Sequence, residues 1–165
     1  MTRTIKIKTF LPYGQDMVWR ALTEPKLLCN WFMETNIEPI RGHYFTFRMK
    51  PQKGWDGITH CEIIDIEPPK HIAYTYRGEA TGEKALACAG IHSEKADKLT
   101  KGIFTKLDTV LSFTLEPTCG GTILFLEHSG YKGLKLALIS LIMQMGWKKL
   151  LRKKLPKVLE QMPNE

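Results

Sequence analysis

The carboxy-terminal segment of residues 133–155 most constrains how this chain can fold. Its apolar side chains recur at steps of three and four residues and form one stripe along a helix; they are Leu136, Ile139, Met143, Trp147, Leu150 and Leu151. A helix of that length reaches about 30 Å, the width of a small domain. We therefore expect it to cover the apolar face of the remaining chain. Pro156, which lacks an N–H, is expected either to end the helix near Leu155 or to bend it there, in which case the helix continues to Met162.

The chain before this helix alternates between apolar and polar residues, which is typical of half-buried strands. The segments with this pattern, or a weaker form of it, are residues 2–11, 36–40, 44–49, 57–67, 71–77, 107–116 and 122–128. Two short helices follow the first segment, one over residues 15–22 and a second that Thr23 caps and Pro25 begins. We expect an antiparallel sheet that curves around the last helix, and hence an α+β fold in a single domain of residues 1–165.

Two stretches do not fit a simple alternation. In residues 57–67, Ile63 and Ile64 cannot face the same way, and we favour Ile63 inward, which leaves Glu62 in solvent. Residues 79–106 have no sustained period and exceed the length of a hairpin loop, so we expect an inserted flap with a short helix over residues 93–99. Residues 51–56 are expected to form a turn.

Composition argues against several classes of protein. The longest uncharged run, residues 136–147, has 12 residues, whereas a membrane span needs about 18. The first residues lack the apolar core and cleavage site of a signal peptide. The cysteines stand far apart and form no CxxC pair, so we expect reduced thiols, a cytoplasmic protein and no metal site; they are Cys29, Cys61, Cys88 and Cys119.

The net charge of +7 is concentrated at the carboxy-terminal end. From Lys132 onward there are eight Lys and Arg residues and two acids, so this segment holds +6 of the total. One interpretation is the solvated face of a helix, which we favour; the other is contact with a membrane surface or an acidic partner. The aromatic residues alternate along strands and do not interleave with the basic residues, so nucleic-acid binding is not expected.

The side of the last helix that points away from the stripe is apolar as well, through Leu138, Leu141, Ile142 and Met145. A helix that is apolar on all sides is normally covered on all sides. The cover is the 79–106 segment, a second copy of the protein in a homodimer, or a membrane surface, and we favour the first two over the third.

Several stretches match a known family in the right order along the chain. They are VWRALTEPKLLCNWF (18–32), IIDIEPPKHIAYTY (63–76), LDTVLSFTLEP (107–117), GGTILFLEHSG (120–130) and GW (146–147). The chain resembles bacterial proteins similar to the C-terminal domain of the activator of the heat-shock chaperone ATPase, in the START-like (SRPBCC, Bet v-like) superfamily. The resemblance implies the helix-grip fold, in which a seven-stranded sheet grips the last helix around an apolar cavity. The 79–106 segment departs from the family pattern.

The expected cavity lies between the sheet and the last helix. Large side chains from both should point into it: Trp31, Phe45, Phe47, Tyr74, Tyr76, Leu111, Phe113, Leu126, His128, Met143 and Trp147. Of these, Tyr74, Tyr76 and His128 are the polar groups. On periodicity alone they fill a densely packed core, whereas the resemblance implies that they surround a hydrophobic ligand, as is common in the superfamily.

We therefore expect the protein to bind a small hydrophobic molecule without a built-in cofactor. The resemblance implies an alternative, a co-factor that associates with the chaperone ATPase by protein contact. A third hypothesis is a cyclase- or hydratase-type enzyme in which His128 is the acid or base. The opposing interpretation of His128 is a structural histidine bonded to the backbone near Ser129.

Overall fold

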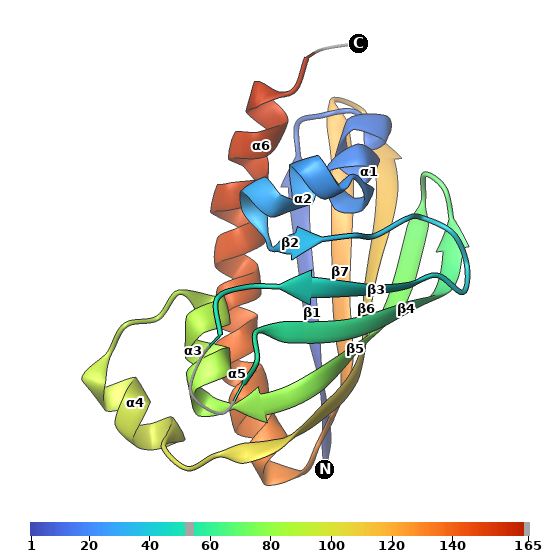
Figure 1. The fold of residues 1–165 in the computed structure, drawn as a ribbon. Coiled ribbons are helices and arrows are strands. Elements are labelled where there is room, and N and C mark those ends of the chain that lie inside the picture. Colours follow the sequence, from blue (N-terminus) through green and yellow to red (C-terminus); the bar gives the residue numbers. More distant parts are fainter. Residues whose placement is uncertain (52–54, 164–165) are drawn as a thin grey trace.

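A computed structural model describes residues 1–51 and 55–163 of the chain. Within these residues, seven strands form one antiparallel sheet in the order β1-β7-β6-β5-β4-β3-β2 (Figure 1). The strands are β1 Thr2–Leu11, β2 Glu34–Thr35, β3 Tyr44–Arg48, β4 Ile58–Glu67, β5 His71–Thr81, β6 Phe104–Thr118 and β7 Gly121–Lys132. The expected α+β fold with its curved antiparallel sheet is confirmed. The last strand, β7, pairs with the first strand, β1, at one edge of the sheet.

The helices gather on one face of this sheet. They are α1 Gln15–Thr23, α2 Pro25–Trp31, α3 Gly82–Ala89, α4 Glu94–Thr100, α5 Gly133–Lys149, the π-helical turn η1 Leu150–Lys154, and α6 Leu155–Gln161. The last three form one rod along the sheet, with α1 and α2 beside α6 and with α3 beside α5 (Figure 1). This is the helix-grip arrangement that the sequence predicts.

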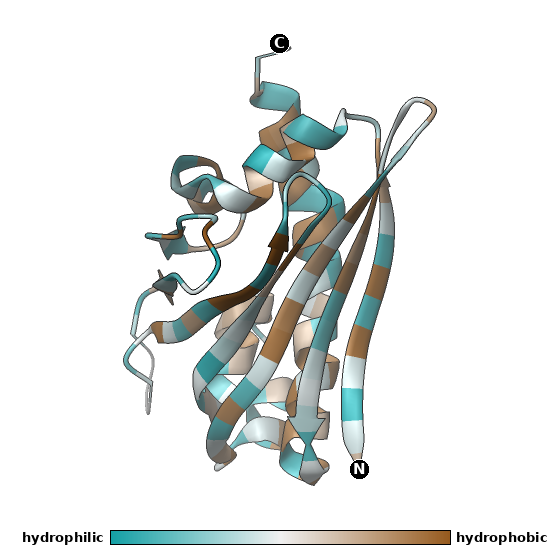
Figure 2. Cartoon of the chain, turned by 90° about the vertical axis from the view of Figure 1, so that its right-hand side faces the viewer, coloured by the Kyte–Doolittle hydropathy of each residue, from teal (hydrophilic) through white to brown (hydrophobic). Residues whose placement is uncertain are grey.

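The apolar stripe of the last helix faces the sheet. All six of its residues are buried. Hydrophobic and hydrophilic residues alternate along the strands (Figure 2), and most of the apolar members of this alternation are buried. Of the two outcomes expected at Pro156, an end of the helix near Leu155 is not found, because the rod continues to Gln161, which matches the longer extent to Met162. The π-helical turn explains this: Leu155 N–H donates to Leu150 C=O, so the hydrogen-bond pattern widens just before Pro156, whose missing N–H then costs little.

The segment between β5 and β6 is shorter and more ordered than the flap expected at residues 79–106. The two strands pair as far as Thr81 and Phe104. The remainder holds α3, which the sequence analysis missed, and α4, which matches the short helix expected there. Ser93 caps α4 by accepting a hydrogen bond from Ala96 N–H.

Two local predictions near the amino-terminal helices are wrong. Thr23 does not cap α2, because its hydroxyl donates to Trp19 C=O within α1, and Glu24 holds the cap position. The strand expected at residues 36–40 is replaced by the short β2 before it. Asn36 there accepts Thr46 N–H with its side chain, and Pro39 has no N–H to donate to a sheet.

The facing of β4 follows the favoured alternative. Ile63 is buried, Ile64 is 40% exposed, and Glu62 lies on the outer face, half-buried. The register shifts between Ile63 and Asp65, which lets the strand carry isoleucines on both sides. The turn expected at residues 51–56 includes residues 52–54, which lie outside the described part of the chain.

Candidate functional site

The eleven predicted site residues come together between the sheet and α5, and each is buried. They contact one another closely: the ring of Phe45 lies 5.1 Å from that of Tyr74, and Phe113 lies 6.1 Å from Trp147. Phe32, which was not predicted, lies between Phe47 and Trp147 at ring distances of 4.8 and 4.9 Å, edge to face with the first and tilted against the second. A cavity of about 10 Å³ beside Met143 and Trp147 adjoins this cluster, so the predicted residues form a packed core.

His128 lies at the centre of a hydrogen-bond network in this core. The Thr109 hydroxyl donates to Tyr76 C=O at 2.8 Å, so it must accept from His128 Nε2, which lies 2.8 Å away. The proton of the neutral imidazole is therefore on Nε2. On the other side of the ring, Nδ1 accepts from Trp147 Nε1–H at 3.2 Å and lies 3.0 Å from the Tyr131 hydroxyl.

Hydrogen bonds fix the tautomer of His128, and burial fixes its charge. The side chain is 0% exposed, and desolvation, followed by the nearby positive charge of Lys84, lowers its pKa from 6.5 to about 3. The imidazole is neutral at physiological pH and both nitrogens have partners. The structural interpretation of this residue is therefore favoured, but its partners are the side chains of Thr109, Tyr131 and Trp147 instead of the backbone near Ser129.

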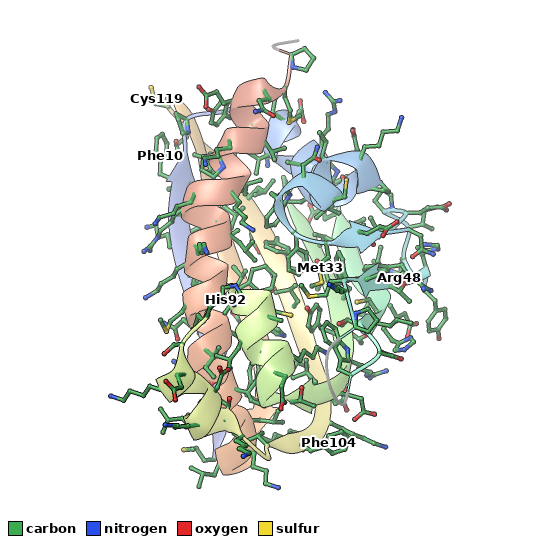
Figure 3. The ribbon with its side chains drawn as sticks, turned by 60° about the vertical axis from the view of Figure 1, so that its left-hand side comes forward. Phe10, Met33, Arg48, His92, Phe104 and Cys119 are labelled. Atoms are coloured by element: carbon green, nitrogen blue, oxygen red, sulfur yellow. The ribbon has the colours of Figure 1, made fainter. Side chains whose placement is uncertain are left out.

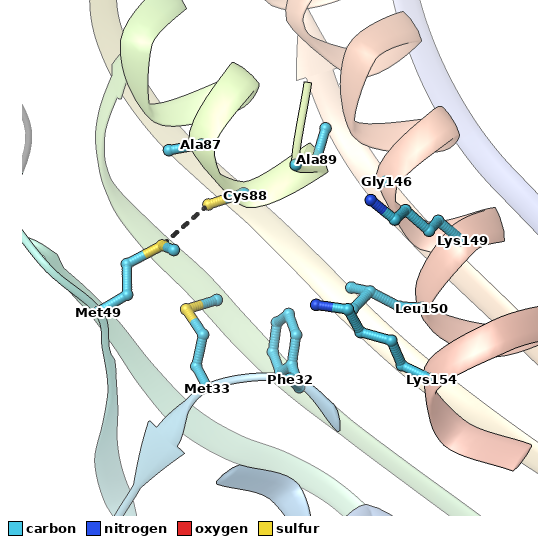
Figure 4. A pocket seen from close by; sticks show the side chains of 11 residues that line it. Phe32, Met33, Met49, Ala87, Cys88, Ala89, Gly146, Lys149, Leu150 and Lys154 are labelled. Carbon is cyan, nitrogen blue, oxygen red and sulfur yellow. Dashed lines mark hydrogen bonds between the residues drawn. The ribbon is translucent and has the colours of Figure 1, made fainter. Parts of the chain in front are cut away.

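A pocket opens beside this core, between α3 and the junction of α5 with η1, and we name it the α3 pocket. Its volume is about 90 Å³, and its lining residues are Phe32, Met33, Met49, Ala87, Cys88, Ala89, Gly90, Gly146, Lys149, Leu150 and Lys154 (Figure 4). Met49 and Cys88 meet across it, with 3.7 Å between their sulfur atoms. Lys149 and Lys154 bring positive charge to an otherwise mainly apolar wall.

Close packing of α3 on α5 forms one side of this pocket (Figure 3). Gly146 makes the contact possible, because a Cβ at this position would lie 2.8 Å from the Cα of Ala89. The α3 pocket and the 10 Å³ cavity under Trp147 share Phe32, Cys88, Ala89, Gly146 and Leu150. Small residues therefore hold α3 directly over the packed core.

Comparison with known proteins places this architecture in a family. The family model described as "Activator of Hsp90 ATPase homolog 1-like protein" matches residues 13–160. The chain belongs to this family. The wider SRPBCC superfamily of such proteins commonly binds hydrophobic ligands. No curated protein matches the chain at the significance applied.

Solved structures share the fold of this family member over nearly its whole length. The protein MLL2253 from Mesorhizobium loti is 28% identical, with 98% of this chain and 100% of that chain covered and a TM-score of 0.74. Protein BH1534 from Bacillus halodurans is 23% identical, with 96% and 99% covered and a TM-score of 0.68. DynU16, a protein in the dynemicin biosynthetic locus, is 18% identical, with 96% and 47% covered and a TM-score of 0.65.

Sequence reasoning missed most of the α3 pocket of this family member. Of the predicted residues, Met143 and Trp147 line the adjoining small cavity, whereas Phe32, Met33, Met49 and Cys88 were not predicted to line a site. Phe32 ends a stretch that matches the family. Cys88 carries no such signal, because its position depends on α3, which the sequence pattern did not reveal.

The described residues offer neither a metal centre nor a membrane-spanning helix. No group of three or more His, Cys, Asp or Glu is placed to hold a metal ion. None of the helices in residues 1–51 and 55–163 is long and apolar enough to cross a membrane.

Proposed function

We propose that this family member binds a small hydrophobic molecule in the α3 pocket, from which the molecule extends inward toward Trp147. The observation that carries the proposal is the α3 pocket of about 90 Å³, which apolar side chains line beside two lysines, next to a second small cavity in the core. The superfamily's common use of hydrophobic ligands supports it.

The pocket walls are suited to widening around a ligand. Pockets for drug-sized molecules hold roughly 300–1,000 Å³, so the α3 pocket must expand when it is filled. Met33 and Met49 are unbranched and adopt new rotamers at low cost, and both border the opening (Figure 4). Rotation of these side chains, with a small outward shift of α3, would join the pocket to the cavity beside Trp147.

A fluorescent lipophile tests this proposal directly. We expect N-phenyl-1-naphthylamine to bind the purified protein with saturable fluorescence enhancement. Met33→Trp should weaken this binding tenfold or more, because the larger ring fills the pocket. Met145→Trp adds the same ring on the outer face of α5, where Met145 is 61% exposed, and should leave binding unchanged.

Two results would contradict the proposal. One is the absence of saturable uptake of any lipophile by wild-type protein, and the other is equal binding by the Met33→Trp and Met145→Trp variants. A pull-down with the host chaperone, run alongside, would then examine the alternative that the family description raises, contact with the chaperone ATPase.

We also propose that a second copy of the chain covers the outer face of α5. Leu138 and Ile142 are half-buried there, but Leu134, Leu141 and Met145 are 80%, 51% and 61% exposed. Leu134, Leu138, Leu141 and Met145 follow one another at steps of four, three and four residues. Apolar residues at alternating steps of three and four form the contact line between paired helices, so this spacing supports a symmetric dimer through α5.

A further inference from the structure

Lys84 is a buried basic residue whose Nζ has no hydrogen-bond or ion-pair partner in the described part of the chain. Its side chain lies on α3 and is 3% exposed. No hydrogen-bond acceptor is within reach of its Nζ, and the ring of Trp55, 4.7 Å away, is its aromatic contact. Burying a charge without a partner costs several kcal/mol, so this arrangement needs an explanation.

The strands beneath α3 make room for this ammonium group. A Cβ at Gly78 of β5 would lie 3.3 Å from Lys84 Nζ and 3.9 Å from the Cα of Thr59. Lys84 Nζ therefore occupies the place that a side chain at position 78 would take. His60 pairs with Arg77, so Thr59 lies next to Gly78 across the two strands, and Tyr76 projects from the same face two residues earlier.

Two more polar groups lie around this position. The hydroxyls of Thr59 and Tyr76 are both buried, at 0% exposure of their residues, and they lie close enough to interact with each other but have no other partner in the described residues. Since one hydroxyl can donate to the other, this pair leaves one hydroxyl donor beside the Lys84 ammonium group in the interior. Asp56 and Glu79 act on Lys84 electrostatically, but neither forms an ion pair with it within the residues described. A group of donors without an acceptor is complementary to a negatively charged oxygen.

The donor group adjoins the α3 pocket. Cys88 follows Lys84 by four residues and so lies on the same face of α3, one turn further along. Cys88 lines the α3 pocket, and its thiol is close enough to Lys84 for the two groups to influence each other's pKa. One helical turn of α3, about 5 Å, therefore separates Lys84 from the wall of the α3 pocket, and an extended molecule that widens the pocket along α3 would bring one end to it.

We propose that Lys84, Thr59 and Tyr76 bind the carboxylate of an amphipathic acid whose apolar chain lies along Phe32 and Met33. This inference rests on the proposed function and adds the class of ligand and its orientation, with the acidic end inward. The carboxylate supplies the counter-charge that Lys84 lacks and accepts from the hydroxyl proton that the Thr59–Tyr76 pair leaves free. The competing explanation is a structural pairing with Glu79, which has a buried carboxylate oxygen without a partner.

Decanoate and decanol, which differ only in the end group, test the proposal by competition against N-phenyl-1-naphthylamine. We expect wild-type protein to bind decanoate at least tenfold more tightly than decanol. Lys84→Gln should remove this preference while leaving decanol binding within twofold of wild type. Glu79→Gln should keep the preference, and so should a variant that replaces the two pocket-wall lysines, Lys149→Gln with Lys154→Gln.

A second measurement does not depend on the variants. The carboxyl carbon of bound [1-¹³C]decanoate should stay in its ionised state to a lower pH than the free acid, because a nearby cation stabilises the carboxylate. The inference would be overturned if the bound carboxyl carbon titrated like that of the free acid. It would also be overturned if the Lys149/Lys154 variant lost the preference for the acid while Lys84→Gln kept it. Equal binding of acid and alcohol would overturn the inference alone, whereas binding of neither would overturn the proposed function as well.

Discussion

At the scale of single residues, His128 shows how burial converts a titratable group into a structural one. Its pKa in the folded protein is lowered to about 3 by desolvation, whereas in the unfolded chain it is about 6.5. Below about pH 6.5 the unfolded chain therefore binds more protons than the folded protein. The stability that the neutral imidazole confers is complete above that pH and is lost as the pH falls toward 3.

This sign gives a measurable pH dependence. In urea unfolding experiments between pH 7.5 and 5, we expect the His128 contribution to the free energy of unfolding to fall by about 1.4 kcal/mol per pH unit below about pH 6. His128→Gln should be less stable at pH 7.5, because it disturbs the contacts to Thr109 and Trp147, but its stability should depend less on pH. Parallel pH profiles of the two proteins would show that His128 does not titrate in this way.

At the scale of elements, Gly146 is the position that sets how α3 lies on α5. In an isolated helix, Gly146→Ala would stabilise by about 1 kcal/mol. In this protein the added Cβ would lie 2.8 Å from the Cα of Ala89, a backbone atom that can move away only if α3 shifts. We expect the steric term to dominate and the variant to lose about 1–3 kcal/mol of stability.

Hydrogen exchange measured by mass spectrometry locates this effect. Peptides from residues 82–100 should exchange faster in Gly146→Ala than in wild type, while the strands stay protected. Met145→Ala, one residue away but exposed, should change stability by no more than about 0.5 kcal/mol. A stabilised Gly146→Ala protein would mean that helix propensity outweighs the contact with Ala89.

The elements that could be predicted from the sequence are those in which a periodic pattern continues over many residues. The apolar stripe from Leu136 to Leu151 identifies the rod, and the alternating segments identify the strands. In each case the apolar residues of the pattern are buried on the same side of their element. α3 was missed because GEKALACA is short and rich in small residues, so no apolar stripe marks it. The α3 pocket was missed with it, because Met33, Met49 and Cys88 approach one another only after three elements are packed together.

At the scale of the whole molecule, the rod has two different sides. Toward the sheet it is sealed by packed aromatic rings and the His128 network, and beside α5 the helix α3 covers part of its outer surface. The remaining outer surface of α5 presents Leu134, Leu141 and Met145, and Lys135 and Lys148 are exposed on the same helix. The expected cover by the 79–106 segment is thus only partial, which leaves this face for a second copy of the chain.

The lysines predict how such a pair responds to salt. Three exposed apolar side chains are a small patch, so we expect a weak dimer that forms with rising protein concentration. The lysines of two copies approach one another and repel, and added salt screens this repulsion. Light scattering coupled to size exclusion should therefore show more dimer at 0.5 M than at 0.05 M NaCl, and Leu141→Glu should remove it. If an anionic membrane surface were the partner instead, the protein would bind phosphatidylserine vesicles, and added salt would weaken that binding. A protein that stays monomeric while it binds such vesicles would exclude the dimer.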